Sequence, residues 1–148
     1  MIKKYLLLFI GLVFITILFV RDIFKEKQIN DIGLVKLNLQ LEGIVDSIDD
    51  VEGFNNCGIV FLTVLKSNIT DLLSHNTKCY YCIIKNDKAE IFTECDLGMK
   101  GSRLTLDTKN KLISYTDNGI PQTGSISINT SEQYQNYIRK HSILLNKY

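Results

Sequence analysis

The chain of 148 residues contains no tryptophan and a single proline, Pro121, and only nine of its residues are glycine. It has no internal repeat and no low-complexity tract, which excludes repeat architectures and biased linkers. Hydrophobic residues make up 45% of the chain, too many for a disordered protein. The composition therefore predicts one globular domain once the apolar N-terminal stretch is set aside.

An excess of positive charge is also missing. Of the 17 Lys and Arg residues, three precede position 22, which leaves 14 against 16 Asp and Glu in the remainder. The remainder therefore has a net charge near −2. Because a domain that binds nucleic acid is expected to be basic, the sequence predicts no nucleic-acid partner.

An uncharged apolar stretch of sixteen residues, 5–20, follows two lysines and ends at Arg21. A cleaved secretory signal would carry small residues before its cleavage site, but this stretch ends in Leu-Phe-Val. No cysteine for lipid attachment follows it, because the first cysteine is Cys57. The pattern therefore favours a retained segment over a cleaved signal.

The stretch can reach across a bilayer when it is counted to Phe24. Twenty helical residues, 5–24, rise about 30 Å, which matches a hydrocarbon core of about 30 Å. Lys4 and Arg21 can extend their charged ends to the two surfaces. We therefore expect a transmembrane helix, with residues 1–24 as a membrane anchor or uncleaved signal segment and 25–33 as a polar stalk.

Positive charges flank the apolar stretch on both sides, so their count alone leaves its orientation open. The likeness to a signal sequence favours an N-terminus in the cytoplasm. The expected location is the bacterial cytoplasmic membrane, crossed once, with the domain on the extracytoplasmic side and an envelope protein as the expected class of partner.

The remainder, 34–148, is expected to be mainly β with one C-terminal helix, an α+β domain. Alternating apolar and polar residues over 35–42 predict a half-buried strand, and the change of phase after Gly43 predicts a bulge or bend. Such bends let a small antiparallel sheet curl into a barrel, so we expect a barrel-like domain of the OB or SH3 type.

The other expected elements follow from apolar runs separated by turn residues. A continuous apolar run predicts a central strand, two pairs of runs predict hairpins, and a short helix and a last strand complete the set. In this order their residue ranges are 57–65 for the central strand, 79–85 with 89–95 and 104–107 with 111–115 for the hairpins, 68–76 for the helix and 124–129 for the last strand.

A helical period predicts a C-terminal helix over 131–146. Its apolar face carries Tyr134, Tyr137, Ile138, Leu144 and Leu145, with Tyr148 beyond it. Thr130 and Gln133 have the spacing of a capping box. This amphipathic helix either packs on the sheet or contacts a partner or a membrane surface, and packing is favoured because such helices usually close small cores.

Cys79 and Cys82 have the spacing of a redox or zinc motif. Residues three apart in a strand point to opposite faces, about 10 Å from each other, so within a strand this pair could neither bridge nor share a metal. A zinc site formed by His75, Cys79, Cys82 and Cys95 is the less favoured alternative.

The first hairpin suggests another use of the cysteines. A three-residue loop at 86–88 would place Cys79 opposite Cys95, close enough for a disulfide, whereas a two-residue loop would misalign them. Cys57 and Cys82 would then be a second pair or free buried thiols.

No arrangement of residues supports nucleophilic, metal or phosphoryl-transfer catalysis. The acidic cluster at Asp46, Asp49, Asp50 and Glu52 lacks the spacing of a calcium-binding EF-hand. The two histidines, His75 and His141, are expected on the surface or on a helix. We therefore predict no catalytic residue and no cofactor, and a binding or structural function. The alternative is a thiol redox or metal-handling protein that uses Cys79 and Cys82.

The apolar N-terminus, GIVDSI at 43–48, GIVFLTV at 58–64 and LTLDTKNKLISY at 104–115 carry a resemblance. Over residues 1–115 the chain resembles a loose group of small bacterial proteins that have a membrane anchor or lipid tether and a short curled β-domain. Members often have a Gly-Asp-Ser turn before the last strands, where this chain has GMKGS at 98–102. The resemblance implies a membrane-anchored β-domain and no catalytic residues.

Overall fold

The computed structural model describes residues 2–51, 57–74, 81–93, 98–117, 119–126 and 131–147, without the side chains of 2–8, 26–27, 29–31, 74 and 117. In chain order the elements are the helix α1 (Ile2–Leu37), the strands β1 (Gln40–Asp50), β2 (Gly58–Ser67), β3 (Leu72–Ser74), β4 (Cys82–Lys85), β5 (Lys88–Thr93), β6 (Arg103–Asp107), β7 (Leu112–Asp117) and β8 (Ile120–Ser125), and the helices α2 (Glu132–His141) and α3 (Ile143–Lys147).

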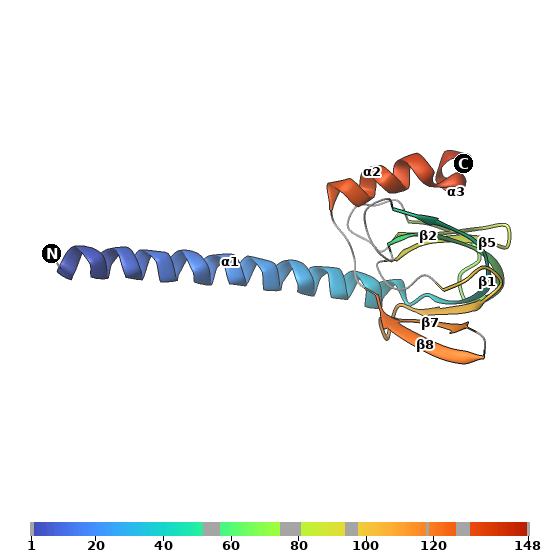
Figure 1. Ribbon diagram of the computed structural model, residues 1–148, viewed down its shortest axis with the longest axis horizontal. Coiled ribbons are helices and arrows are strands. Elements are labelled where there is room, and N and C mark those ends of the chain that lie inside the picture. Colours follow the sequence, from blue (N-terminus) through green and yellow to red (C-terminus); the bar gives the residue numbers. More distant parts are fainter. Residues whose placement is uncertain are drawn as a thin grey trace.

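The eight strands form one antiparallel sheet in the order β3-β4-β5-β2-β1-β6-β7-β8. The prediction of a mainly β protein is confirmed, and β2 lies in the middle of the sheet as its apolar run predicts. Figure 1 shows that the sheet is curved, with α2 and α3 along one side and α1 projecting away from it.

The predicted barrel-like closure is wrong, because the sheet is open and has β3 and β8 at its two edges. The end of α1 supplies a physical reason. Leu34 is 1% exposed and Leu37 packs against the same hydrophobic cluster, which also contains side chains of β1, β2 and β4 to β7. The curved sheet therefore covers its apolar face with a helix instead of closing on itself.

The predicted strand over 35–42 begins too early. Helix α1 continues through Gly33 to Leu37, and β1 begins only at Gln40. Asn38 follows the helix, and its φ of 45° is the left-handed conformation common after a helix C-terminus. Leu34 and Leu37 are three residues apart, so they lie on the same face of a helix and both reach the core. Apolar residues in this segment can therefore be buried by a helix as well as by the predicted alternating strand.

The bulge predicted at Gly43 is confirmed. The pairing of β1 with β2 shifts register between Glu42 and Gly43. A Cβ atom at Gly43 would lie 2.8 Å from the backbone oxygen of Thr63, so the close approach of the two strands requires glycine there. A second register shift falls between Val45 and Ser47 and bends the strand further.

The hairpin of β4 and β5 is present with a different turn. Asn86 and Asp87, with φ of 50° and 60°, form a two-residue turn, and Lys85 pairs with Lys88. The predicted three-residue loop is therefore wrong. Asn and Asp tolerate the positive φ that the favoured two-residue hairpin turn demands, and this preference decides the register.

The second predicted hairpin is confirmed as β6 and β7. The predicted helix at 68–76 is wrong, because its middle forms β3, which pairs with β4. The last strand is β8, which starts at Ile120, four residues before the predicted range, while 127–129 lie outside the described residues. In both segments pairing with a neighbouring strand outweighs the local pattern.

The C-terminal helix packs on the sheet, as favoured, but it is broken into α2 and α3 at Ser142. Ser131 is the N-cap of α2 and makes no side-chain capping bond, and Thr130 of the predicted capping box lies outside the described residues. The predicted apolar face is confirmed for its described residues, which pack on a second hydrophobic cluster that includes Ile59, Ile83 and Phe92. Tyr148 lies outside the described residues.

Candidate functional site

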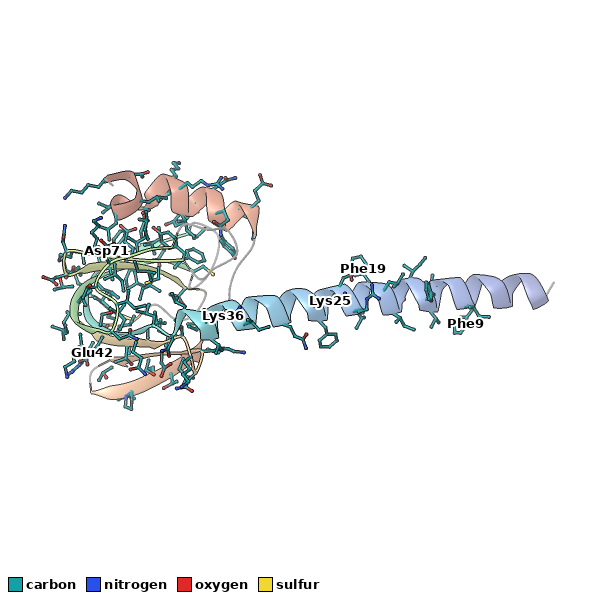
Figure 2. All side chains as sticks on the ribbon, turned by 180° about the vertical axis from the view of Figure 1, so that it is seen from behind. Phe9, Phe19, Lys25, Lys36, Glu42 and Asp71 are labelled. Atoms are coloured by element: carbon teal, nitrogen blue, oxygen red, sulfur yellow. The ribbon has the colours of Figure 1, made fainter. Side chains whose placement is uncertain are left out.

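Helix α1 presents large apolar side chains to solvent over residues 9–24. Their exposed fractions run from 41% to 70%, and the residues are Phe9, Ile10, Leu12, Val13, Phe14, Ile15, Ile17, Phe19, Val20, Ile23 and Phe24. Figure 2 shows Phe9 and Phe19 on the part of the helix that projects from the domain. A helix that is apolar on every side is normally buried in protein or lipid, so this segment is a candidate contact surface.

Charged residues interrupt the apolar surface from Arg21 onward. Arg21 and Asp22 form an exposed ion pair at 3.8 Å, and Lys25 follows one turn later. Within the part of the chain that the structure describes, no helix is both long enough and apolar enough to cross a membrane.

A hollow of about 540 Å³ lies between the end of β1 and helix α2. Its lining combines carboxylate, imidazole, phenol, ammonium and amide groups from Asp49, Asp50, Val51, Asn136, Tyr137, Lys140 and His141. Small-molecule sites are usually lined mainly by apolar side chains with a few polar groups, and this hollow is lined mainly by polar ones. Whether these polar side chains are already paired with one another decides whether the hollow could bind or react with a ligand.

Asp49 and His141 form the closest polar pair in this hollow, with 2.8 Å between Oδ2 and Nδ1. The ring of Tyr137 stacks on the imidazole, with 4.2 Å between the ring centroids. Burial raises the pKa of Tyr137, and the carboxylates of Asp49 and Asp50 raise it further, so the phenol stays protonated.

An aspartate that orients a histidine supplies two members of a Ser-His-Asp triad, whose third member is a nucleophilic side chain. Among the described residues no Ser, Thr or Cys lines this hollow. The pair instead connects the last turn of α2 to β1. Since the imidazole and the Asp49 carboxylate are both partly exposed, the pair is a modest tie between helix and sheet.

Glu90 is the most buried charged side chain of the described sheet, at 1% exposure. Its Oε2 accepts hydrogen bonds from the Tyr81 hydroxyl at 2.8 Å and the Ser142 hydroxyl at 2.6 Å. Its Oε1 accepts the backbone N–H groups of Ile143 at 2.9 Å and Leu144 at 2.7 Å. A buried carboxylate needs such donors, and here they include the first N–H groups of α3.

The same network acts on Tyr81. Burial raises the pKa of Tyr81, and the negative charge of Glu90 adds to the shift. The phenol therefore remains a hydrogen-bond donor to the carboxylate. Because all the groups named satisfy one another, the network holds α3 on the sheet and offers no unpaired acid or base.

A third polar group crosses three strands at the surface. Lys88 Nζ lies 2.8 Å from Asp46 Oδ2 and 2.6 Å from Thr63 Oγ1. Beside it is a hollow of about 310 Å³ whose floor includes Phe61, Leu62 and Leu144. Lys88 is half exposed and paired with a carboxylate, which is typical of a surface ion pair and not of a desolvated catalytic amine.

Two cysteines lie in the described segments, and both are buried free thiols. Cys82 belongs to the cluster that contains Leu34, and Cys57 to the cluster under α2. Of the two alternatives for this pair, free thiols are confirmed and a mutual disulfide is wrong. Burial raises the pKa of the Cys82 thiol, and Glu90 raises it further, so the reactive thiolate is disfavoured.

The proposed disulfide partners, Cys79 and Cys95, lie outside the described residues. The register on which their pairing depended is wrong, because Ile83 lies opposite Glu90 and not opposite Ile91. The geometric argument for this disulfide therefore no longer holds.

The zinc hypothesis can be followed only at Cys82, since His75, Cys79 and Cys95 lie outside the described residues. Cys82 is 0% exposed and packed among apolar side chains. Across the described ranges, no group of three His, Cys, Asp or Glu side chains is placed to hold a metal ion. The absence of such a group also applies to Asp46, Asp49 and Asp50 of the acidic cluster, while Glu52 of that cluster lies outside the described residues.

The polar groups that the structure brings together were not predicted as pairs. Tyr81 and Glu90 are nine positions apart, and Glu90 and Ser142 are 52 apart. The only local signal was a glutamate among apolar residues in a strand, which a partner must compensate. A comparison of the chain with protein-family models, curated proteins and solved structures finds no match.

Proposed function

We propose that this chain is a single-pass bacterial membrane protein. Residues 5–24 would cross the cytoplasmic membrane, and the β-rich domain would act outside the cytoplasm by binding or supporting an envelope protein. The observation that carries the proposal is the exposure of apolar side chains over residues 9–24 on a helix that projects from the domain (Figure 2). Burial of apolar area is favourable by about 25 cal/mol per Å², and a bilayer provides it.

The sequence and the continuous helix together support this proposed span. The apolar sequence starts at Tyr5, before the first described side chain, and α1 is continuous through this region. Twenty residues of helix rise about 30 Å, the thickness of a typical hydrocarbon core. Lys4 and Arg21 then lie where their charges can reach the two surfaces.

A binding or structural role is favoured over catalysis by the way the polar side chains are used. In the hollows, Asp49 is engaged by His141 and Asp46 by Lys88. Each pair joins two elements of the fold. A thiol redox role is disfavoured, because Cys82 has no access to solvent and its thiolate is destabilised.

Membrane fractionation tests the anchor. The full chain should remain in membranes after a carbonate wash. The double variant Phe14→Arg/Ile17→Arg should leave the membrane fraction or be degraded, since each central arginine costs about 2.5 to 3.5 kcal/mol on insertion. The matched control Leu65→Arg changes an exposed apolar residue of the domain and should stay with the membranes.

Two results would contradict the anchor. One is a soluble mature chain that mass spectrometry shows to lack the first two dozen residues. The other is full-length wild-type protein in the soluble fraction. Orientation is tested separately with a C-terminal phosphatase fusion that is active only outside the cytoplasm, and an inactive fusion would place the domain inside.

Thiol titration tests the redox alternative. In the native protein Cys57 and Cys82 should not react with a thiol reagent, and both should react after denaturation, because both are buried. Rapid modification of Cys82 in the folded chain, identified by peptide mapping, would favour the redox function instead.

A further inference from the structure

Helix α1 enters the core without a break. It is helical from Ile2 to Leu37, and its last turns pack on the sheet through Leu34 and Leu37. On the same turns Val35 is 43% exposed, so one side of the helix faces the core and the other faces solvent. The proposed stalk, 25–33, is therefore a continuation of the helix and not a flexible linker.

The joint after the helix is clamped on one side by Asn68, at the end of β2. The Asn68 side chain donates from Nδ2 to the backbone oxygen of Asn38 at 2.7 Å, and its Oδ1 accepts the N–H of Gln40 at 2.8 Å. The N–H of Asn68 also donates to the oxygen of Gln40 at 3.1 Å. The side chain of Asn68 thus bridges Asn38, the left-handed residue after the helix, and Gln40, the first residue of β1.

Thr108, in the turn between β6 and β7, binds Leu39, the residue between Asn38 and Gln40. The N–H of Leu39 donates to Thr108 Oγ1 at 2.8 Å, and the N–H of Thr108 donates to the oxygen of Leu39 at 3.0 Å. Leu39 and Thr108 are both fully buried. Buried hydrogen bonds such as these are costly to break. Together with the exposed bonds of Asn68 to Asn38 and Gln40, they connect all three joint residues to the sheet.

We infer that α1 and the sheet form one rigid unit, in which Asn68 and Thr108 are positioning residues that fix the angle between helix and sheet. On the proposed membrane anchor this inference gives the domain a single orientation over the bilayer. The ten helical steps from Phe24 to Leu34 rise about 15 Å. A partner protein would meet the same face of the sheet at that height, and the domain would not swing on a tether.

Distance measurements between spin labels test the rigid unit in the full chain. Labelled non-natural residues replace Gln28 in the stalk and Thr105 in β6, both exposed, so that the native cysteines stay. A second pair, Thr105 with Gln122 in β8, reports on the sheet alone. In lipid vesicles both pairs should give one narrow distance distribution.

The joint is then weakened by Asn68→Ala together with Thr108→Val. The stalk-to-sheet distribution should become at least twofold broader while the sheet pair stays narrow. Thr108→Ser, which keeps the hydroxyl, should restore most of the narrow width when it replaces Thr108→Val. A broad or multiple stalk-to-sheet distribution in the wild-type chain, or a width that the double variant leaves unchanged, would overturn the inference.

The same labels separate this inference from the proposed anchor. If the chain does not insert into vesicles, the anchor fails, and the measurement in detergent still decides whether the joint is rigid. If the double variant also broadens the distribution of the sheet pair, it has lost its fold. The test of the joint is then the width of the stalk-to-sheet distribution in the wild type and in the single variants Thr108→Ser and Thr108→Val.

Discussion

At the residue scale, the main feature is a carboxylate placed inside the fold. Glu90 accepts four hydrogen bonds, two of them from the first N–H groups of α3. A helix of five residues is not stable alone, and two of its N-terminal N–H groups find their acceptor in a neighbouring strand. One acidic side chain therefore stabilises the docking of α3, in addition to the apolar contacts of Leu144 and Leu145.

Replacing Glu90 should destabilise the domain. Glu90→Ala leaves buried donors without an acceptor, which should lower the free energy of unfolding by about 3 kcal/mol. Glu90→Gln keeps one oxygen and should cost less. Chemical denaturation measures both, and hydrogen exchange at Ile143 and Leu144 should accelerate.

The control for this prediction is Glu132→Gln, an exposed change at the start of α2, which should stay within about 0.5 kcal/mol of wild type. If Glu90→Ala were as stable as this control, the network would not hold α3.

Asp107 gives a prediction about pH. The backbone N–H of Asn110 and then its side-chain amide hold the pKa of Asp107 below its ordinary value, at 3.0 and 2.8 Å. Because the folded pKa is lower than the unfolded one, ionised Asp107 stabilises the fold above the unfolded value of about 3.9. This contribution is lost as the pH falls through the folded pKa.

Thermal unfolding between pH 7 and pH 2.5 checks it. Asp107→Asn should have a flatter acid limb than wild type, with little change in that slope above pH 5. An identical slope in the two proteins below pH 4 would show that the turn does not depend on the charge.

At the element scale, the main feature is that the end of α1 packs on the sheet. Its last turns place Leu34 at 1% exposure beside strand residues, while Val35 on the adjacent position is 43% exposed. Figure 1 shows the same element projecting far beyond the domain at its other end. One helix thus serves two environments, a protein core and the proposed bilayer.

Truncation of Leu34 and of Val35 should have different effects on the free energy of unfolding, because the two side chains lie on different faces of the helix. Leu34→Ala should lower the free energy of unfolding by about 3 kcal/mol, since it leaves a cavity in the core. Val35→Ala should change it by less than about 0.5 kcal/mol. Urea denaturation of both variants is the measurement, and equal effects would mean that the helix does not pack on the sheet.

At the scale of the whole molecule, one curved sheet separates two hydrophobic clusters. One cluster is covered by the end of α1, and the other by α2 and α3. Each face of the sheet is therefore covered by a helix, and the fold should depend on the last turns of the helix whose first part is the proposed anchor.

Two truncated chains should differ sharply. A chain that begins at residue 28 keeps Leu34 and Leu37, and it should be soluble and folded without detergent. A chain that begins at residue 38 loses both side chains. Burial of Leu34 contributes about 1.5 to 3 kcal/mol and the partly buried Leu37 adds a smaller amount, against a total stability of about 5 to 15 kcal/mol. Circular dichroism and size-exclusion chromatography compare them. Equal folding would place the helix outside the core.

Local pattern was enough for several features. The apolar N-terminus predicted an apolar helix, although its membrane crossing remains a prediction. The continuous run at 58–64 predicted a central strand, Gly43 predicted a bulge, and the spacing from Tyr134 to Leu145 predicted a docked helical face. These features depend on which side chains must avoid water and on where the backbone needs glycine, and both are properties of short segments.

Other features were decided only by the tertiary structure. The helix end at Leu37, the two-residue turn at Asn86 and the open sheet depend on which neighbour each segment meets. So do the buried pairs of Glu90 with Ser142 and of Leu39 with Thr108, whose members lie far apart in the chain. A sequence pattern indicates that a polar group must find a partner, but only the packed chain selects that partner, because burial strengthens the bond and removes the competing water.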